Sequence, residues 1–177
     1  MTDEGQDVVI RRATTEDAAS LALIGGATFL DAFAGVIDGR DIVEHCARQH
    51  STGVYVAWLN NPDAALWLAD AHNGGAPVGY AVLDSPQLTI AQPGDLEVKR
   101  IYVLSRFHGT GVGSRLMAAA LDEARHRGAR RALLGVYANN HRALAFYAKH
   151  GFQIVGERRF RVGANTYDDH VLSLQLR

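Results

Sequence analysis

The feature that most constrains this chain is a strand, a glycine-rich turn and a helix in direct succession. The apolar run Leu96–Leu104 predicts the strand, glycines between positions 109 and 113 form the turn, and Gly128 ends the helix that follows. Glycines let backbone N–H groups approach an anion closely, and a helix N-terminus adds a partial positive charge. Arg106 and Arg115 flank the turn. The segment therefore predicts a binding site for a phosphate or pyrophosphate.

Three known phosphate-binding turns can be compared with this segment. A P-loop requires Gly-Lys-Ser/Thr, whereas Gly113 is followed by Ser114 and Arg115. The dinucleotide-binding fingerprint requires a third glycine at position 114, which is serine. The pattern Arg/Gln-x-x-Gly-x-Gly/Ala is met by three residues: Arg106, Gly109 and Gly111. Glycine-rich turns between a strand and a helix also occur without a ligand, so a second motif has to support this interpretation.

The second motif is the stretch Asn139–Phe152, which reads NNHRALAFYAKHGF and follows the glycine turn after a further helix and strand. Together the two motifs resemble the GNAT superfamily of acetyl-CoA-dependent N-acetyltransferases, with its Asn-x-x-Ala…Phe-Tyr…Gly-Phe block. The resemblance is strong from Leu96 to Gly151. Weaker agreement extends to Gly79, Tyr80, Phe160 and Asp168 or Asp169. The extended pattern is most similar to the bacterial spermidine/spermine acetyltransferase branch.

Hydrophobic patterns and turn signals predict the order of the elements. We expect strands over residues 7–12, 65–71, 76–83, 96–104, 132–136, 152–160 and 166–176. We expect helices over 14–33, interrupted at Gly25-Gly26, and over 41–49, 111–127 and 139–150; residues 54–59 form a short apolar segment. Consecutive strands beside strand–helix alternation indicate one mixed α/β (α+β) sheet. With the resemblance, this implies a single-domain GNAT fold over residues 1–177, with about six to seven strands and about four helices.

Composition excludes several other classes of protein. The chain has 177 residues, 47% of them hydrophobic and 21% charged, which is typical of a globular domain. A single cysteine, Cys46, excludes an internal disulfide framework and a cysteine-based zinc site, and the eight histidines show no metal-binding spacing. The apolar runs are shorter than the ~20 residues of a membrane span, and the first residues lack an apolar signal core. We therefore expect a cytoplasmic protein, monomeric or homodimeric, with no metal, nucleic-acid or membrane partner.

The resemblance implies acetyl-CoA as co-substrate and assigns residues to it. Backbone groups of the strand would bind the pantetheine arm, the glycine turn would hold the pyrophosphate, and Asn140 would hydrogen-bond the arm. Asn140 is also a natural helix N-cap, and the two roles are compatible. The predicted cofactor-binding residues are Ile101, Tyr102, Val103, Arg106, Gly109, Thr110, Gly111, Val112, Gly113, Ser114 and Asn140.

The resemblance also implies direct acetyl transfer to an amine in a ternary complex. Tyr147 matches the family tyrosine that protonates the departing thiolate; alternatively it packs in the core beside Phe146. Glu97 stands where some family members carry a catalytic base; alternatively it is ion-paired with Lys99 or Arg100. An acyl-cysteine route through Cys46 is rejected, because this cysteine shares a helical face with apolar residues.

Charge divides the chain into two parts and suggests the acceptor. Residues 1–97 carry 14 acidic and 4 basic side chains, whereas residues 98–177 carry 5 acidic and 14 basic ones. The acids of the first helical region are Asp31, Asp38, Asp41 and Glu44. If they line the acceptor side, the acceptor is a small cationic amine such as spermidine or spermine; alternatively they face solvent. The other function classes left open are acetylation of a protein N-terminus or lysine, and a non-catalytic acetyl-CoA-binding regulatory module.

Overall fold

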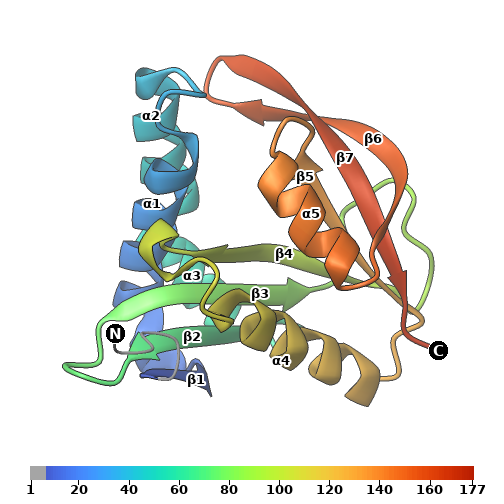
Figure 1. Ribbon diagram of the computed structural model, residues 1–177, viewed down its shortest axis with the longest axis horizontal. Coiled ribbons are helices and arrows are strands. Elements are labelled where there is room, and N and C mark those ends of the chain that lie inside the picture. The colour runs from blue at the N-terminus through green and yellow to red at the C-terminus, as the bar shows by residue number, and fades with distance from the viewer. Residues whose placement is uncertain (1–6) are drawn as a thin grey trace.

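The computed structural model describes residues 7–177, and its strands form one seven-stranded mixed sheet in the order β1-β2-β3-β4-β5-β7-β6 (Figure 1). The strands are β1 (Val8–Arg12), β2 (Ala65–Ala71), β3 (Pro77–Asp84), β4 (Leu96–Val103), β5 (Arg131–Tyr137), β6 (Gln153–Val162) and β7 (Asn165–Gln175). The helices are α1 (Ala18–Phe33), α2 (Gly39–Gln49), α3 (Thr52–Leu59), α4 (Val112–His126) and α5 (His141–Lys149), with 3-10 turns η1 (Thr15–Asp17) and η2 (Ser105–Phe107). The predicted class, one mixed α/β sheet with helices, is confirmed.

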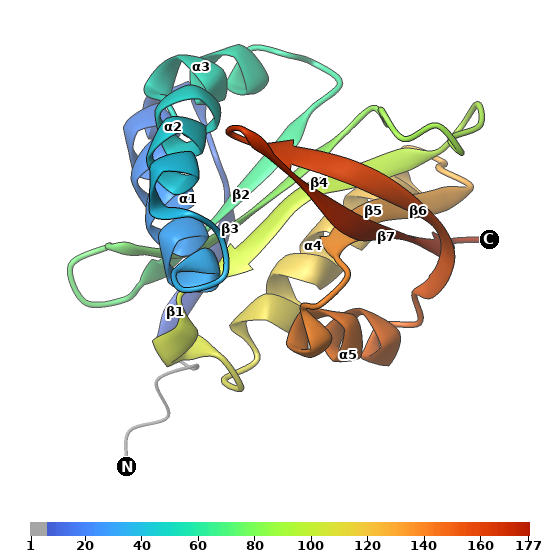
Figure 2. The same cartoon turned by 90° about the horizontal axis from the view of Figure 1, so that it is seen from above.

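Helices cover both faces of the sheet, with α1, α2 and α3 on one side and α4 and α5 on the other (Figure 2). Strand β3 lies between the two layers and is buried on both faces. Its Ala81 and Leu83 pack in the core beneath α4, whereas Tyr80 and Val82 pack in the core beneath α1 and α3. This alternation has the period of two that a strand requires, so one strand serves two apolar cores.

Strands β4 and β5 pair in parallel over a very short length. Their register is restricted to Leu96 with Ala132 and Glu97 with Leu133. Each strand continues for several residues beyond these pairs, to Val103 and Tyr137. The sheet therefore opens in its middle, and the opening widens toward the glycine turn that follows β4.

The expected interruption of the first helix at Gly25-Gly26 is wrong. Helix α1 runs unbroken from Ala18 to Phe33. A side chain at Gly25 would collide with the Tyr55 hydroxyl and with Nδ1 of His50. Gly25 therefore allows α1 to pack closely against Tyr55 and His50. This packing stabilises the helix at a position where glycine alone would destabilise it.

The segment 54–59 is a fifth helix that the sequence analysis did not assign. Helix α3 begins after Ser51, whose Oγ accepts a hydrogen bond from the backbone N–H of Val54 at 3.4 Å. Its apolar residues surround the helix instead of forming one stripe, so the sequence carries no helical periodicity. Residues 7–177 thus contain five helices, in agreement with the expected sheet flanked by about four. Among residues 7–177, none of the helices is long and apolar enough to cross a bilayer.

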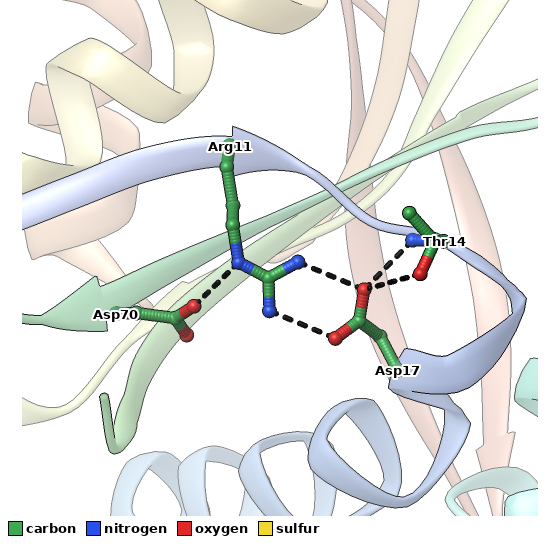
Figure 3. Close-up of polar contacts among 4 residues, drawn as sticks. All are labelled: Arg11, Thr14, Asp17 and Asp70. Atoms are coloured by element: carbon green, nitrogen blue, oxygen red, sulfur yellow. Dashed lines mark hydrogen bonds and ion pairs between the residues drawn. The ribbon is translucent and has the colours of Figure 1, made fainter. Parts of the chain in front are cut away.

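A charged network joins the start of the chain to the sheet (Figure 3). Arg11 donates from Nε to Asp70 at 2.7 Å and from Nη1 and Nη2 to the two carboxylate oxygens of Asp17, both at 2.8 Å. The backbone N–H of Thr14 donates to the same Asp17 carboxylate at 2.7 Å. The hydrogen bonds from Arg11, with that from the Thr14 backbone, lower the pKa of Asp17 to about 2. This network fixes β1, β2 and the turn that leads into α1.

Candidate active site

A cavity of about 650 Å³ occupies the opening between β4 and β5. Its wall includes residues from α1, α2, β4, the glycine turn, β5, α5 and the β6–β7 hairpin. Among the predicted site residues, those that line it are Glu97, Ile101, Tyr102, Val103, Gly109, Gly111, Gly113, Ser114, Asn140 and Tyr147. Three further predicted residues, Arg106, Thr110 and Val112, lie outside the lining.

The glycine turn has a backbone that other residues rarely adopt. Gly109 and Gly111 have φ angles of 79° and 86°, and Gly111 is the N-cap of α4. A Cβ atom built on either glycine would meet nothing within 4 Å. Thr110 braces the turn by donating from Oγ1 to the carbonyl of Phe107 at 2.6 Å. The turn therefore leaves open space in front of a helix N-terminus, as a bound pyrophosphate would need.

The flanking arginines have other contacts in the structure. The Arg106 guanidinium lies over the ring of Phe107, at 5.0 Å from its centroid. Arg115 donates from Nη1 to the carbonyl of Val8 at 2.9 Å, so this side chain connects α4 to β1. Ser114, in the first turn of α4, lies 3.1 Å from Nε2 of His150 through its Oγ.

The open edge of β4 faces the cavity with its backbone. The N–H of Leu104 donates to Val78 on β3 at 2.9 Å. Because backbone polar groups alternate in direction along a strand, those of Ile101 and Val103 point to the opposite edge, toward β5. Nε2 of His108 already lies 2.7 Å from the Val103 carbonyl. Val103 can still accept a second hydrogen bond, since a carbonyl has two lone pairs.

Asn140 and Tyr147 lie at the two ends of α5. The Asn140 side-chain oxygen accepts a hydrogen bond from the N–H of Ala143 at 3.1 Å, so Asn140 is the N-cap of this helix and also lines the cavity. Tyr147 is 8% exposed and packs edge-on against Phe146 and Phe152, with centroid distances of 5.4 and 6.0 Å. Burial raises the pKa of Tyr147, so its hydroxyl is protonated at neutral pH. The ring thus packs in the core while the residue contributes to the cavity wall.

Glu97 lies at the closed end of the opening, where β4 still pairs with β5. Its carboxylate accepts hydrogen bonds from the backbone N–H of Gln87 at 2.9 Å and from Nζ of Lys99 at 2.8 Å. Glu97 and Lys99 are both largely buried, with 5% and 10% of their side chains exposed. The ion pair that the sequence analysis gave as the alternative therefore exists, and both partners line the cavity.

Two arginines on the cavity wall, Arg100 and Arg158, belong to neither of the sequence motifs. Arg158 donates from Nε to Asp169 at 3.1 Å, and burial raises the pKa of this aspartate. A side chain at Gly135 would collide with the Arg158 guanidinium, so this glycine lets Arg158 cross the face of β5. Arg100 projects from β4 toward Tyr55 and His50. The hairpin and α2 are far from β4 in sequence, so no local pattern predicts these contacts.

The four acids of the first helical region are largely used elsewhere. Asp38 accepts from the N–H of Arg40 at 2.9 Å as the N-cap of α2, and Glu44 pairs with Arg48 at 2.7 Å on the surface. Asp41 is buried and binds Ala164 and Asn165 at the tip of the β6–β7 hairpin. Asp31 accepts hydrogen bonds from Ser105 and lines the cavity. Of these four acids, Asp31 alone faces the candidate active site.

Known proteins share both the sequence pattern and the fold. Residues 37–152 match the family model described as Acetyltransferase (GNAT) family. An uncharacterised N-acetyltransferase of Mycobacterium tuberculosis is 35% identical over 160 residues, which cover 90% of this chain and 98% of that protein. The N-alpha-acetyltransferase RimI of the same organism is 41% identical over 100 residues, which cover 55% of this chain and 60% of that protein. The crystal structure of the PaiA N-acetyltransferase from Thermoplasma acidophilum, in complex with coenzyme A, has a TM-score of 0.78 at 18% identity and covers 95% of this chain and 98% of that one.

A mixed sheet that opens beside a glycine turn, with an N-capped helix on the far side, defines an acyltransferase of the acetyl-CoA-dependent class. The chain belongs to the GNAT acetyltransferase family. It is therefore an N-acetyltransferase, as the sequence motifs predicted. Within residues 7–177, no group of three or more His, Cys, Asp or Glu side chains is placed to hold a metal ion.

Proposed function

We propose that the enzyme transfers the acetyl group of acetyl-CoA directly to a primary amine inside the cavity between β4 and β5. The observation that carries this proposal is the opening of the sheet beyond Glu97, which forms a cavity lined by the glycine turn, by Tyr147 and by the ion pair of Glu97. We further propose a single domain over residues 1–177 that acts in the cytoplasm as a monomer or homodimer.

The residues present fit acetyl-CoA. The open space over Gly109 and Gly111, at the start of α4, suits a pyrophosphate. The backbone groups of Ile101 and Val103 at the open edge of β4 suit the amides of the pantetheine arm, and Asn140, the N-cap of α5, lines the same cavity. Bound acetyl-CoA supplies the acetyl group as a thioester, whose C–S bond breaks as the C–N bond to the amine forms.

The reaction needs a base for the amine and an acid for the sulfur. Glu97 is the proposed base: its carboxylate takes the proton from the amine, directly or through a water molecule, while Lys99 holds that carboxylate in place. Tyr147 is the proposed acid: its raised pKa keeps Oη protonated until the sulfur accumulates negative charge. The two residues lie on different elements, β4 and α5, and both line the same cavity.

Turnover of acetyl-CoA, with detection of free thiol, tests this proposal across polyamines, amino acids, aminoglycosides and peptides. Amine-dependent release of thiol, together with an N-acetylated product identified by mass spectrometry, is the expected result. If acetyl-CoA binds and no amine is consumed, the alternative of a non-catalytic regulatory module replaces it.

The division of charge along the sequence predicts a polyamine as the acceptor. In the structure, Asp31 is what supports this acceptor, since Asp38, Asp41 and Glu44 bind elsewhere. Acetylation of a protein N-terminus is the second candidate function, and the sequence similarity to RimI favours it. Spermidine and a peptide with a free N-terminus are therefore both included in the turnover test.

A further inference from the structure

The acceptor side of the cavity has more fixed positive charge than negative charge. Its buried carboxylates are Glu97 and Asp169, and each has a cationic partner: Lys99 at 2.8 Å and Arg158 at 3.1 Å. Within each pair the two charges neutralise each other. Arg100 lines the same cavity and makes no ion pair with any carboxylate in residues 7–177. Arg142, Lys149 and Arg161 also line the cavity without an ion pair, whereas among residues 7–177 Asp31 is the one lining carboxylate that has no cationic partner, so this wall has an excess of positive charge.

Hydrogen bonds at Nη1 and a contact with an aromatic ring fix the position of the Arg100 guanidinium. Its Nη1 donates to the carbonyl of Gln49 and to the hydroxyl of Tyr55, both at 2.8 Å, and lies 3.2 Å from Nδ1 of His50. Its Cζ atom lies over the ring of Trp58, 4.7 Å from the ring centroid. Among the residues that the structure describes, Nε and Nη2 of Arg100 donate to no partner. Several N–H donors of a pre-positioned guanidinium are thus left for a ligand.

The two histidines near Arg100, His50 and His45, are uncharged at neutral pH. Burial, with a smaller contribution from Arg100, lowers the pKa of His50 to about 3 and that of His45 to about 4. Both histidines are therefore neutral at physiological pH, whereas an arginine stays protonated. At neutral pH Arg100 is therefore charged, and the two histidines beside it add no further positive charge.

The same wall is rich in aromatic rings. Those that line the acceptor side come from α1, α3, β5 and the β6–β7 hairpin: Phe29, Phe33, Trp58, Tyr137, Phe160 and Tyr167. Phe29 stacks on His45 with ring centroids 4.2 Å apart, and Tyr137 meets both Phe33 and Tyr167 edge-on. An apolar or aromatic group of the acceptor would be buried here, next to a fixed cation.

We propose that Arg100 binds the carboxylate of the acceptor, and that the acceptor is a free amino acid with an apolar or aromatic side chain. This proposal rests on the N-acetyltransferase function given above and names its substrate class. Arg100 follows Glu97 by three residues, which is about 10 Å along a strand, and directly precedes Ile101. The carboxylate would therefore be held beside β4, between Glu97 and the residues Ile101 and Val103 that are proposed to bind the pantetheine arm.

A polyamine is disfavoured by the same charges. It would bring further positive charge next to Arg100 and Arg161, where among residues 7–177 Asp31 is the single acid without a cationic partner that lines the cavity. A carboxylate instead forms charge-assisted hydrogen bonds with the guanidinium. The sign of the charge beside the reacting amine thus separates the two acceptor classes.

Matched amines that differ in this one group test the proposal. We would compare kcat/KM for L-phenylalanine, L-phenylalaninamide, 2-phenylethylamine and spermidine, and repeat the comparison with L-leucine and L-leucinamide. The amide has the more weakly basic amine, so it would react faster if amine chemistry alone decided. We expect the two amino acids to be preferred over their amides by about 10- to 100-fold, the range of a hydrogen bond to a charged group.

Variants of Arg100 identify its role. Arg100→Met should bring the ratio of amino acid to amide close to one while calorimetry shows unchanged affinity for acetyl-CoA. Arg100→Lys should keep part of the preference, and it provides the test if the methionine variant fails to fold. Arg48→Met is the matched control, since it removes one positive charge from the exposed surface of α2 outside the cavity and should leave the ratio unchanged.

The outcomes separate this proposal from the function on which it rests. Preference of the wild-type enzyme for spermidine or the amides, or an unchanged ratio in the Arg100 variants, overturns the carboxylate site and leaves the acetyltransferase function intact. Absence of acetyl-CoA binding, with no amine consumed, contradicts the proposed function itself.

Discussion

Tyr147 packs its ring in the core and also lines the cavity. Its hydroxyl oxygen is needed for the proposed acid role but not for the packing of the ring. Tyr147→Phe removes the hydroxyl and keeps the ring contacts with Phe146 and Phe152. We expect kcat to fall by about 10²–10⁴-fold with little change in KM for acetyl-CoA, since a general acid acts in the transition state. Steady-state kinetics measure this effect, and calorimetry with coenzyme A confirms that the site is intact. An unchanged kcat would leave Tyr147 with packing alone.

Glu97 is coupled to Lys99, so its replacement has two consequences. Glu97→Gln should abolish activity at neutral pH, with partial recovery at higher pH, where more of the amine is already deprotonated. It also leaves Lys99 buried without a counter-ion, which is destabilising in itself.

The double variant Glu97→Gln/Lys99→Met removes both charges and distinguishes these effects. If Glu97 is the base, the double variant shows the same low activity as the single variant at each pH, including the same partial recovery at high pH. Recovery of wild-type activity in the double variant would assign Glu97 a purely structural ion pair.

At the scale of elements, the glycine turn and the start of α4 form one unit for binding an anion. Gly111→Ala places a methyl group in the open space at the helix N-terminus and strains a residue at φ 86°. We expect the affinity for acetyl-CoA to fall by about 10- to 100-fold, as measured by calorimetry. Gly74→Ala is the matched control: it has φ 81° and open space as well, but it lies in the β2–β3 turn. Equal losses of affinity in the two variants would contradict the pyrophosphate site.

The packing of α1 on α3 offers a second matched pair of glycines. Gly25→Ala would force the new methyl group into Tyr55 and His50, and we expect a loss of stability of about 1–3 kcal/mol. Gly26→Ala meets nothing within 4 Å and should stabilise the helix by about 0.5–1 kcal/mol. Denaturant unfolding measures both changes. A stabilising Gly25→Ala would show that the contact yields easily.

The glycines of the turn and the glycine in α1 also show what the sequence can and cannot predict. Gly109 and Gly111 act locally, within one turn, so their spacing was enough to identify the turn and the family. Gly25 acts through residues on another helix, and from sequence alone it resembled a helix break. Helix α3 was missed for a related reason, because a short segment with apolar residues all round has no period to detect.

On the scale of the whole molecule, the order of strands and the two motifs were predictable, while the acceptor side was not. Strand patterns and turn residues depend on near neighbours, and all seven strands of the sheet were expected. The acceptor side depends on contacts between distant segments, such as Arg158 over Gly135 and Asp41 against the hairpin. Charge counted along the sequence placed Asp41 at the substrate, whereas in the folded chain it fixes the hairpin to α2.

The buried histidines make the stability of the whole molecule depend on pH. Burial lowers the pKa of His50 to about 3 and that of His45 to about 4, below the value near 6.5 that they regain on unfolding. Below pH 6.5 the unfolded chain therefore binds more protons than the folded one, so acid favours unfolding. We expect the free energy of unfolding to fall by about 1–2 kcal/mol per histidine between pH 7 and pH 5.

Replacement of one histidine isolates this contribution. His50→Gln keeps a side chain that can bind Tyr55 and Arg100 but cannot take up a proton in this range. The dependence of unfolding free energy on pH between 7 and 5 should fall to roughly half in this variant, as denaturant titrations at each pH would measure. Asp17 acts in a lower window, because its pKa of about 2 makes its contribution disappear only below its unfolded value of 3.8. A His50 signal that titrates near pH 6.5 in the folded protein, followed by NMR, would contradict the lowered pKa of His50 on which this prediction depends.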